Sequence, residues 1–218
     1  MEHILITAKN SDSEKAQALQ DITELFLDFE PTATDKVINQ RVFGDSLGEL
    51  DILKVDNDVA AFNITKLLSF EDGKIVTYLL GTITNPKFRN QGLFKKILQT
   101  TIRRHQPHYL ALQTQVPIIY GGLCSLFGVD SVYPNMNCST PPVVMRVAQL
   151  INQKQILDTT QPFAIVRDMY DIDRTKRSDR KYGDHRVNQF FAENLGTFDA
   201  FAVVVDLSNH GTKSVKTT

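Results

Sequence analysis

Alternating apolar and polar positions divide the chain into short elements, and the stretch from Ile75 to Arg104 has the clearest pattern. Residues 75–84 are apolar and β-rich, residues 85–92 are polar and suited to a turn, and residues 93–104 repeat apolar side chains at helical spacing. A strand, a turn and a helix in this order leave unpaired backbone N–H groups at the helix N-terminus. These groups and the positive end of the helix dipole attract phosphate, so the stretch predicts an anion-binding turn.

The residues before this stretch predict two helices and an antiparallel meander. Helical spacing predicts a helix over residues 13–29 and a shorter one over residues 34–42. Strand-like runs at residues 50–55 and 59–70 lead through short turn sequences into the strand at 75–84. Strands joined by turns this short pair antiparallel.

The second half of the chain predicts alternating strands and helices. The expected elements are a strand at 108–114, a helix from Pro117 with a buried face of Ile118, Ile119, Leu123, Leu126 and Phe127, a helix at 143–153, a strand at 163–169, a helix at 185–195 and a strand at 200–207. The charged residues 171–184 predict a solvated loop, with a lid or a partner contact as the alternative. The fold class is therefore α+β, with a single mixed, mostly antiparallel sheet flanked by helices and a C-terminal insert. We expect a single domain of this class at residues 1–208, followed by a flexible tail at residues 209–218.

Composition narrows the classes of function. The 218 residues are 42% hydrophobic and 22% charged, with a formal net charge of −1, which is typical of a soluble globule and argues against a nucleic-acid binder. The two cysteines do not form a disulfide scaffold, and neither a signal peptide nor an apolar stretch of membrane-spanning length is present, so we expect a cytoplasmic protein without membrane contact. His105 and His108 have no carboxylate or cysteine beside them in the sequence, so we expect no metal site. The sequence does not decide whether the protein forms a homodimer.

The polar turn carries residues suited to phosphate. Gly92 allows the backbone to approach a ligand closely, because it has no Cβ. Arg89, three residues earlier, has a planar guanidinium that matches phosphate oxygens. An ordinary strand-to-helix connection is the alternative, and the succession of long strand, Pro86, basic turn, glycine and cationic helix favours binding.

This turn resembles the acetyl-CoA loop of the GCN5-related N-acetyltransferase (GNAT) family. The matching residues are Thr84, Pro86, Phe88, Arg89, Gly92 and Phe94. The resemblance extends over residues 50–130, because His108 to Val129 is similar to the family's fifth strand and the helix after it. Asn90 and Phe94 stand where the family usually has small residues, and Phe94 narrows the mouth of the loop.

The resemblance implies an acetyltransferase-like fold and direct transfer of an acetyl group from acetyl-CoA to a primary amine, with no covalent enzyme intermediate. The acceptor is a small-molecule or peptide amine. The implied cofactor-binding residues are Leu80, Gly81, Thr82 and Ile83 of the strand and Phe88, Arg89, Asn90, Gln91, Gly92, Leu93 and Phe94 of the loop.

The catalytic residues are less well defined. In the family, the general acid is often a tyrosine in the helix after strand five, and Cys124 stands at that position here. Tyr120 lies one turn earlier on the same helical face and is the preferred acid, with Cys124 or water as alternatives. Glu49, Asp51 and Glu71 are the carboxylates near the meander. Glu49 is the candidate base, although nothing in the sequence chooses among the three.

Two other functions stay open. Cys124 at the usual tyrosine position is compatible with a non-catalytic, acyl-CoA-binding regulatory module. A purely structural α+β domain with an accidental loop is the third interpretation, and failure to bind CoA would favour it.

Overall fold

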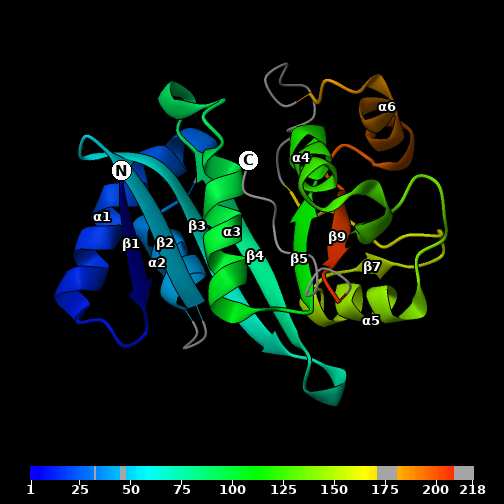
Figure 1. Cartoon of the computed structure of the whole chain (residues 1–218), viewed down its shortest axis with the longest axis horizontal. Helices are drawn as coiled ribbons and strands as arrows, with labels where there is room; N and C mark the ends of the chain where they lie inside the picture. The colour runs from blue at the N-terminus through cyan, green and yellow to red at the C-terminus, as the bar shows by residue number, and fades with distance from the viewer. Residues whose placement is uncertain (32, 45–47, 171–180, 209–218) are drawn as a thin grey trace. The chain divides into compact units, whose positions relative to one another are not determined.

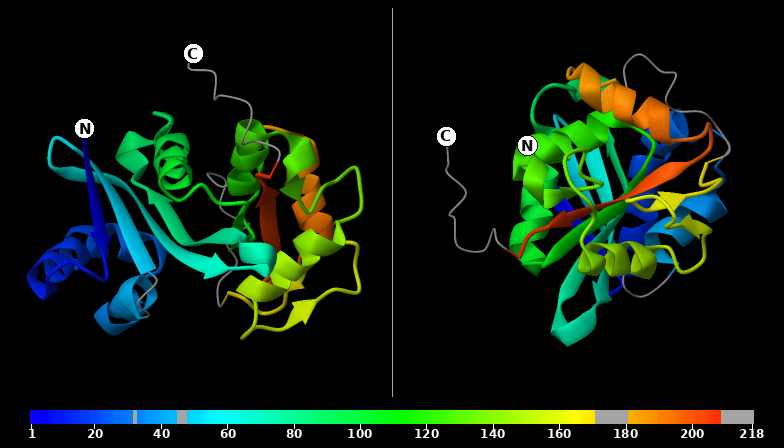
Figure 2. Two further views of the ribbon diagram at one scale, coloured as in Figure 1. Left: turned by 60° about the horizontal axis from the view of Figure 1, so that its bottom comes forward. Right: turned by 90° about the vertical axis from the view of Figure 1, so that its right-hand side faces the viewer.

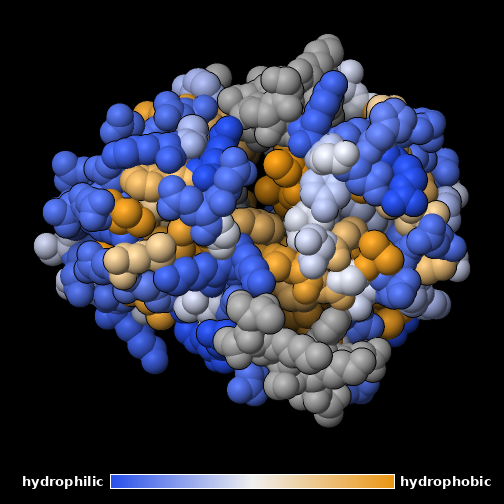
Figure 3. All heavy atoms as spheres, turned by 45° about the horizontal axis from the view of Figure 1, so that its top comes forward, coloured by the Kyte–Doolittle hydropathy of each residue, from blue (hydrophilic) through white to orange (hydrophobic). Residues whose placement is uncertain are grey.

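The computed structural model describes residues 1–31, 33–44, 48–170 and 181–208 (Figure 1). These residues form two compact units: Met1–Leu68 with Thr77–Gln106, and Ser69–Val76 with Pro107–Thr218. The face drawn in Figure 3 carries mostly hydrophilic residues. Within the described ranges, no helix combines the length and the apolar character needed to cross a bilayer.

The first unit is an antiparallel meander with helices on both faces. Its strands follow the order β1 (Glu2–Thr7), β2 (Gly48–Val55), β3 (Asp58–Ser69) and β4 (Ile75–Thr84). Helices α1 (Asp12–Phe29) and α2 (Asp35–Phe43) cover one face, and α3 (Leu93–His105) covers the other, as the left view of Figure 2 shows. The predicted meander is confirmed, and its last strand has the predicted bounds. Strand β1, which pairs antiparallel with β2, was missed because six residues give a weak alternation.

Local sequence explains where the first two helices begin. The Ser11 hydroxyl accepts a hydrogen bond from the Glu14 backbone N–H, and the Glu14 side chain accepts one from the Ser11 N–H at 2.8 Å. This reciprocal capping box satisfies donors that the first turn leaves unpaired. Thr34 caps α2 in the same way through the Val37 N–H, and Gly44 ends that helix.

The core of the first unit lies between α1, α2 and one face of the meander. Ile22 and Phe26 of α1 pack with Ile38 of α2 against Leu50 and Phe62 of the sheet. Leu50 and Phe62 belong to the β2–β3 hairpin. Its turn is formed by Asp56 and Asn57, whose φ angles are 51° and 68°. Two consecutive left-handed residues match the twist of a two-residue hairpin, and Asp and Asn tolerate this conformation better than most residues.

The second unit contains the remaining strands and helices. The strand order is β5 (Tyr109–Thr114), β9 (Ala200–Asp206), β8 (Ile165–Val166) and β7 (Leu157–Asp158), while β6 (Val132–Tyr133) pairs with β9; the helices are α4 (Pro117–Phe127), α5 (Pro142–Ile151) and α6 (His185–Asn194). Strand β9 pairs antiparallel with β5, with Leu112 opposite Val203. The chain between these two paired strands is the C-terminal insert. The predicted α+β class, a mixed and mostly antiparallel sheet flanked by helices, is confirmed.

The predicted buried face of α4 is largely wrong. Of the five residues predicted for this face, only Leu123 is buried, and Ile118 is 42% exposed. The buried residues include Tyr120 and Gly121 instead. Tyr120 packs on the aromatic rings of α6, and a Cβ on Gly121 would collide with the ring of Tyr182. The contact with Tyr182 therefore explains why this helix needs a glycine at residue 121.

Other predictions for the second unit have mixed outcomes. The helices predicted at 143–153 and 185–195 are confirmed with slightly different ends. The strand predicted at 163–169 is shorter in the structure, where only β8 is a strand. It ends before Arg167, because Arg167 forms ion pairs with Asp158 and Asp199 and Asp168 has a φ of 50°. Most of the charged segment and the predicted tail, at 171–180 and 209–218, lie outside the described residues.

Candidate functional site

The loop between β4 and α3 is anchored at its start. Its first turn is the 3₁₀ helix η2 (Pro86–Phe88). The Asn85 side chain accepts a hydrogen bond from the Lys87 N–H at 3.0 Å and donates one to the Val59 carbonyl at 3.1 Å. Phe88 is buried in the apolar cluster beneath α3. These hydrogen bonds and the buried Phe88 fix the start of the loop, and the exposed residues follow directly after it.

The N-terminus of α3 is open to a ligand. Asn90 and Gly92 have φ angles of 62° and 71°, and Gly92 is the N-cap, with no side chain capping the helix. The first intrahelical bond runs from the Lys96 N–H to the Gly92 carbonyl at 3.0 Å. The N–H groups of Leu93, Phe94 and Lys95 therefore have no acceptor within the helix. Helices α1, α2 and α6, by contrast, begin with a capping side chain.

This terminus fits a phosphate group. Left-handed residues on each side of a turn direct successive N–H groups into a concave anion site. A Cβ built on Gly92 has no described atom within 4 Å, so the described residues leave the space around this position open. Asn90, which departs from the small residue usual in the family, adopts the left-handed conformation that asparagine tolerates.

The charge around the loop is positive. Lys87, Arg89, Lys95 and Lys96 are exposed, and α3 contains no aspartate or glutamate. Lys87 donates a hydrogen bond to Asp58 at 2.6 Å, which raises the pKa of the lysine. A helix dipole and nearby cations both stabilise a bound anion.

The predicted pantetheine-binding residues, Leu80 to Ile83, lie in the second half of β4. Leu80 and Ile83 both pack in the core cluster on the α1 and α2 side. Thr82, between them, donates its hydroxyl proton to Asn63, whose other partner, Thr101, is on α3. The cofactor-binding role of Leu80, Gly81, Thr82 and Ile83 stays a prediction.

The three candidate carboxylates are all engaged in ion pairs. Glu49 lies 3.1 Å from Arg104 and 2.8 Å from His105. Asp51 is fully buried and forms a bidentate pair with Arg104. Glu71 forms a bidentate pair with the exposed Arg146 of α5. The role of Glu49 as the general base stays a prediction.

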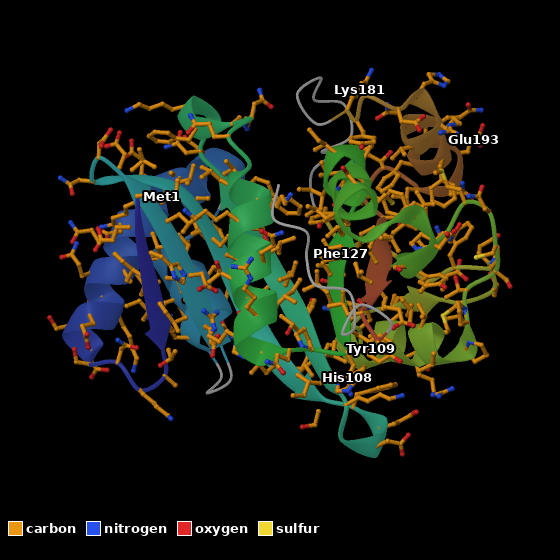
Figure 4. All side chains as sticks on the ribbon, viewed as in Figure 1. Met1, His108, Tyr109, Phe127, Lys181 and Glu193 are labelled. Atoms are coloured by element: carbon orange, nitrogen blue, oxygen red, sulfur yellow. The ribbon has the colours of Figure 1, made fainter. Side chains whose placement is uncertain are left out.

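The two histidines considered for a metal have separate roles. His105 contacts Glu49, a neighbour that the sequence did not reveal because 56 residues separate the two. His108, labelled in Figure 4 just before β5, contacts the Ile75 N–H through Nδ1 at 3.2 Å. Among the described residues, no group of three or more histidine, cysteine, aspartate or glutamate side chains is arranged to hold a metal ion.

The candidate acids, Tyr120 and Cys124, lie together in the second unit. Tyr120 is 1% exposed, and its hydroxyl donates to the Pro134 carbonyl at 2.6 Å. Burial, and then the neighbouring Cys124, raise the pKa of Tyr120. Cys124 is partly buried, and burial raises the pKa of its thiol. Both groups therefore hold their protons at neutral pH, and only the thiol is partly accessible.

Comparisons with known proteins concern the fold. No family model and no curated protein matches the chain. Among solved structures, the chain is similar to a ribosomal-protein-alanine N-acetyltransferase from Brucella melitensis biovar Abortus 2308, at 13% identity over 52% of this chain and 79% of that chain, with a TM-score of 0.42. The chain is also similar to Tetrahymena GCN5, at 12% identity over 65% of this chain and 84% of that chain, with a TM-score of 0.45.

A third solved structure spans more of the chain. It is the NatC complex bound to Gag peptide and CoA, in which one chain is 11% identical over 95% of this chain and 99% of that chain, with a TM-score of 0.46. At these identities and TM-scores, the likeness says nothing about activity. The α+β class of the chain rests on its own strands and helices.

Proposed function

We propose that the chain is an N-acetyltransferase that uses acetyl-CoA and a primary amine. The observation that carries this proposal is the open N-terminus of α3 behind the left-handed Asn90 and Gly92, in a positively charged loop. Acetyl-CoA would supply an activated acetyl thioester that the amine attacks directly. The acceptor is a small molecule or a peptide, and the near-neutral net charge of the chain favours neither a polycationic nor a polyanionic one.

The loop would bind the pyrophosphate. The N–H groups of Leu93, Phe94 and Lys95 supply donors, and Arg89 supplies a planar guanidinium that can bind two phosphate oxygens. The segment of β4 from Leu80 to Ile83 would present backbone groups to the pantetheine amides. Backbone donors at the same place would polarise the thioester carbonyl, because fixed N–H groups stabilise a developing oxyanion.

Proton transfer requires a base for the amine and an acid for the departing thiolate. Glu49 is the candidate base for the amine, either directly or through water. Of the two candidate acids, the geometry favours Cys124, because the Tyr120 proton already binds the Pro134 carbonyl and the ring is buried. A protonated thiol can donate its proton to the departing CoA thiolate.

Binding of the cofactor is tested by thermal unfolding with acetyl-CoA, CoA and ATP. A ligand that binds only the native protein, at a hundred times its dissociation constant, stabilises it by about 2.7 kcal/mol. We expect a rise in Tm with acetyl-CoA and with CoA and none with ATP, followed by release of free thiol when amines are added. No rise at millimolar acetyl-CoA would contradict the proposal and favour a purely structural domain.

Cys124→Ala and Tyr120→Phe separate the two candidate acids. Cys124→Ala is expected to lower kcat by about 100-fold, the lower end of a general acid's contribution. Tyr120→Phe is expected to lower the free energy of unfolding by about 1 kcal/mol, through the lost hydrogen bond, and to leave kcat nearly unchanged. Steady-state kinetics and urea denaturation check both, and the opposite pattern would assign the acid to Tyr120.

A second function is supported by the same side chains. The buried Tyr120 and the paired Glu49 are compatible with a regulatory module that binds acyl-CoA without turnover. Both functions predict the rise in Tm with CoA. Only the enzyme releases free thiol in the presence of an amine.

A further inference from the structure

The sheet surface beneath the second half of α3 is polar. Asp51 of β2 and Asn63 of β3 are opposite each other in the strand register, and both are fully buried, as is Thr101 of α3. The first half of the helix instead packs apolar side chains, among them Leu93 and Ile97. Apolar residues of similar volume stabilise a buried contact as well as polar ones or better. Stability alone therefore does not account for these polar side chains.

Asp51 is the fixed end of this group. Its Oδ1 atom accepts a hydrogen bond from Arg104 at 2.9 Å and contacts His3 at 2.7 Å. Its Oδ2 atom accepts from Arg104 at 2.7 Å and lies 3.2 Å from the Thr101 hydroxyl. Burial disfavours the charged Arg104, but its hydrogen bonds and charge attraction to Asp51 and Glu49 together outweigh this, and the pKa of Arg104 is raised. The arginine holds the carboxylate in one orientation.

The donor and the acceptor of each hydrogen bond between Asp51 and Thr82 can be assigned in one way only. The Thr101 hydroxyl has one proton, and both Asp51 and the Ile97 carbonyl, at 3.1 Å, can only accept it. Toward Asn63, Thr101 therefore offers lone pairs, so Asn63 must present its NH₂ group, at 3.4 Å. The amide oxygen of Asn63 then faces Thr82, whose hydroxyl donates to it at 2.7 Å.

Thr82 is the accessible end of this chain of hydrogen bonds. It is half-buried on β4, beside Gly81, in the segment that the proposed function assigns to the pantetheine arm. Because its only proton is directed to Asn63, its hydroxyl offers lone pairs to a ligand and accepts an N–H group. The pantetheine arm of CoA carries two amide N–H groups.

We propose that Asn63 is a positioning residue that orients the Thr82 hydroxyl to accept a hydrogen bond from an amide N–H of the pantetheine arm. Asn63 acts through Thr82 and touches no ligand itself, while Thr101 and Asp51 fix the direction of its amide. This assignment rests on the proposed function and goes beyond it, because it names a side chain that discriminates CoA from ligands without pantetheine.

Calorimetric titration with two probes tests this assignment. CoA carries the pantetheine arm, and adenosine 3′,5′-bisphosphate lacks it. Thr82→Val is expected to weaken CoA binding by about fivefold to tenfold, the effect of one hydrogen bond, and to leave the Kd of the bisphosphate unchanged. Thr82→Ser, the matched control, keeps the hydroxyl and should keep the affinity for CoA.

Asn63→Leu frees the Thr82 hydroxyl to rotate, and it should cause the same selective loss as Thr82→Val. Because the two residues act through one hydrogen bond, the double variant should bind CoA no more weakly than either single variant. A purely structural role for Asn63 predicts a lower Tm with an unchanged ratio of the two Kd values, which would overturn the assignment. If Asn63→Leu does not fold, the two Thr82 variants decide the question.

Failure of this inference is distinguishable from failure of the proposed function. A wild-type protein that binds neither probe contradicts the acetyl-CoA site itself, and the role of Asn63 falls with it. A wild-type protein that binds CoA, with an unchanged Kd in Thr82→Val, overturns only the role of Thr82 and Asn63.

Discussion

Arg89→Ala combined with Gly92→Glu is expected to weaken CoA binding at least about 100-fold while the protein still unfolds cooperatively. The first change removes a charged donor for phosphate. The second places a carboxylate at the open N-terminus of α3, where it repels the pyrophosphate. A side chain at φ 71° costs about 1–2 kcal/mol, and the new carboxylate recovers about 0.3–1 kcal/mol of this from the helix dipole. Calorimetry and urea denaturation measure the two effects separately.

The chain offers a closely matched control for this double variant. Gly73 has a φ of 70° and, like Gly92, no described atom within 4 Å of a built Cβ. Arg103 is an exposed cation near the other end of α3. Arg103→Ala combined with Gly73→Glu therefore makes the same change of charge and backbone strain away from the loop, and it should leave the Kd for CoA within twofold or so of the wild type. If the two double variants bind CoA with equal affinity, the CoA site does not lie at this loop.

Asp51→Ala is expected to lower the free energy of unfolding by about 3–5 kcal/mol. The carboxylate is fully buried and contacts Arg104, His3 and Thr101, so its removal leaves a partly buried guanidinium without its main partner. Urea denaturation monitored by circular dichroism gives the value. A protein of this size has about 5–15 kcal/mol of stability in total, so the change is a large share of it.

A rescue variant tests the physical reason for this loss. Asp51→Leu combined with Arg104→Met removes both charges and fills the same volume with apolar groups, and it should recover most of the lost stability. Asp58→Ala is the surface control, because Asp58 and its partner Lys87 are both more than half exposed and should contribute nothing measurable. A loss below about 1 kcal/mol in Asp51→Ala would show that water reaches Arg104 and replaces the carboxylate.

Elements with local causes were predictable. Strand β4 has the predicted bounds, and α3 begins directly after the predicted Gly92, because a period-two run, a proline, a glycine and a helical repeat all act within a few residues. The open N-terminus of α3, on which the predicted anion site rests, has the same local origin. It needs only a strand end, a residue that tolerates positive φ and a helix without a capping side chain.

The buried face of α4 was not predictable from local sequence. Its apolar residues surround the helix, so the period alone does not say which of them face inward. The rings of Tyr182, Phe190 and Phe191, about 60 residues later, cover Gly121 and Tyr120 and so decide the question. Tyr120 thereby becomes a core residue with a bound hydroxyl.

By itself, the sequence determined the order and type of most elements, the α+β class and the position of the loop before α3, because each follows from the spacing of neighbouring residues. Only the tertiary structure decided what the carboxylates do. Asp51 and Glu49 meet Arg104 and His105 across more than 50 residues, and Asn63 reaches Thr101 across 38. Such contacts depend on which strand lies under which helix, and no local pattern records this. The direction of the Thr82 hydroxyl follows from that arrangement alone.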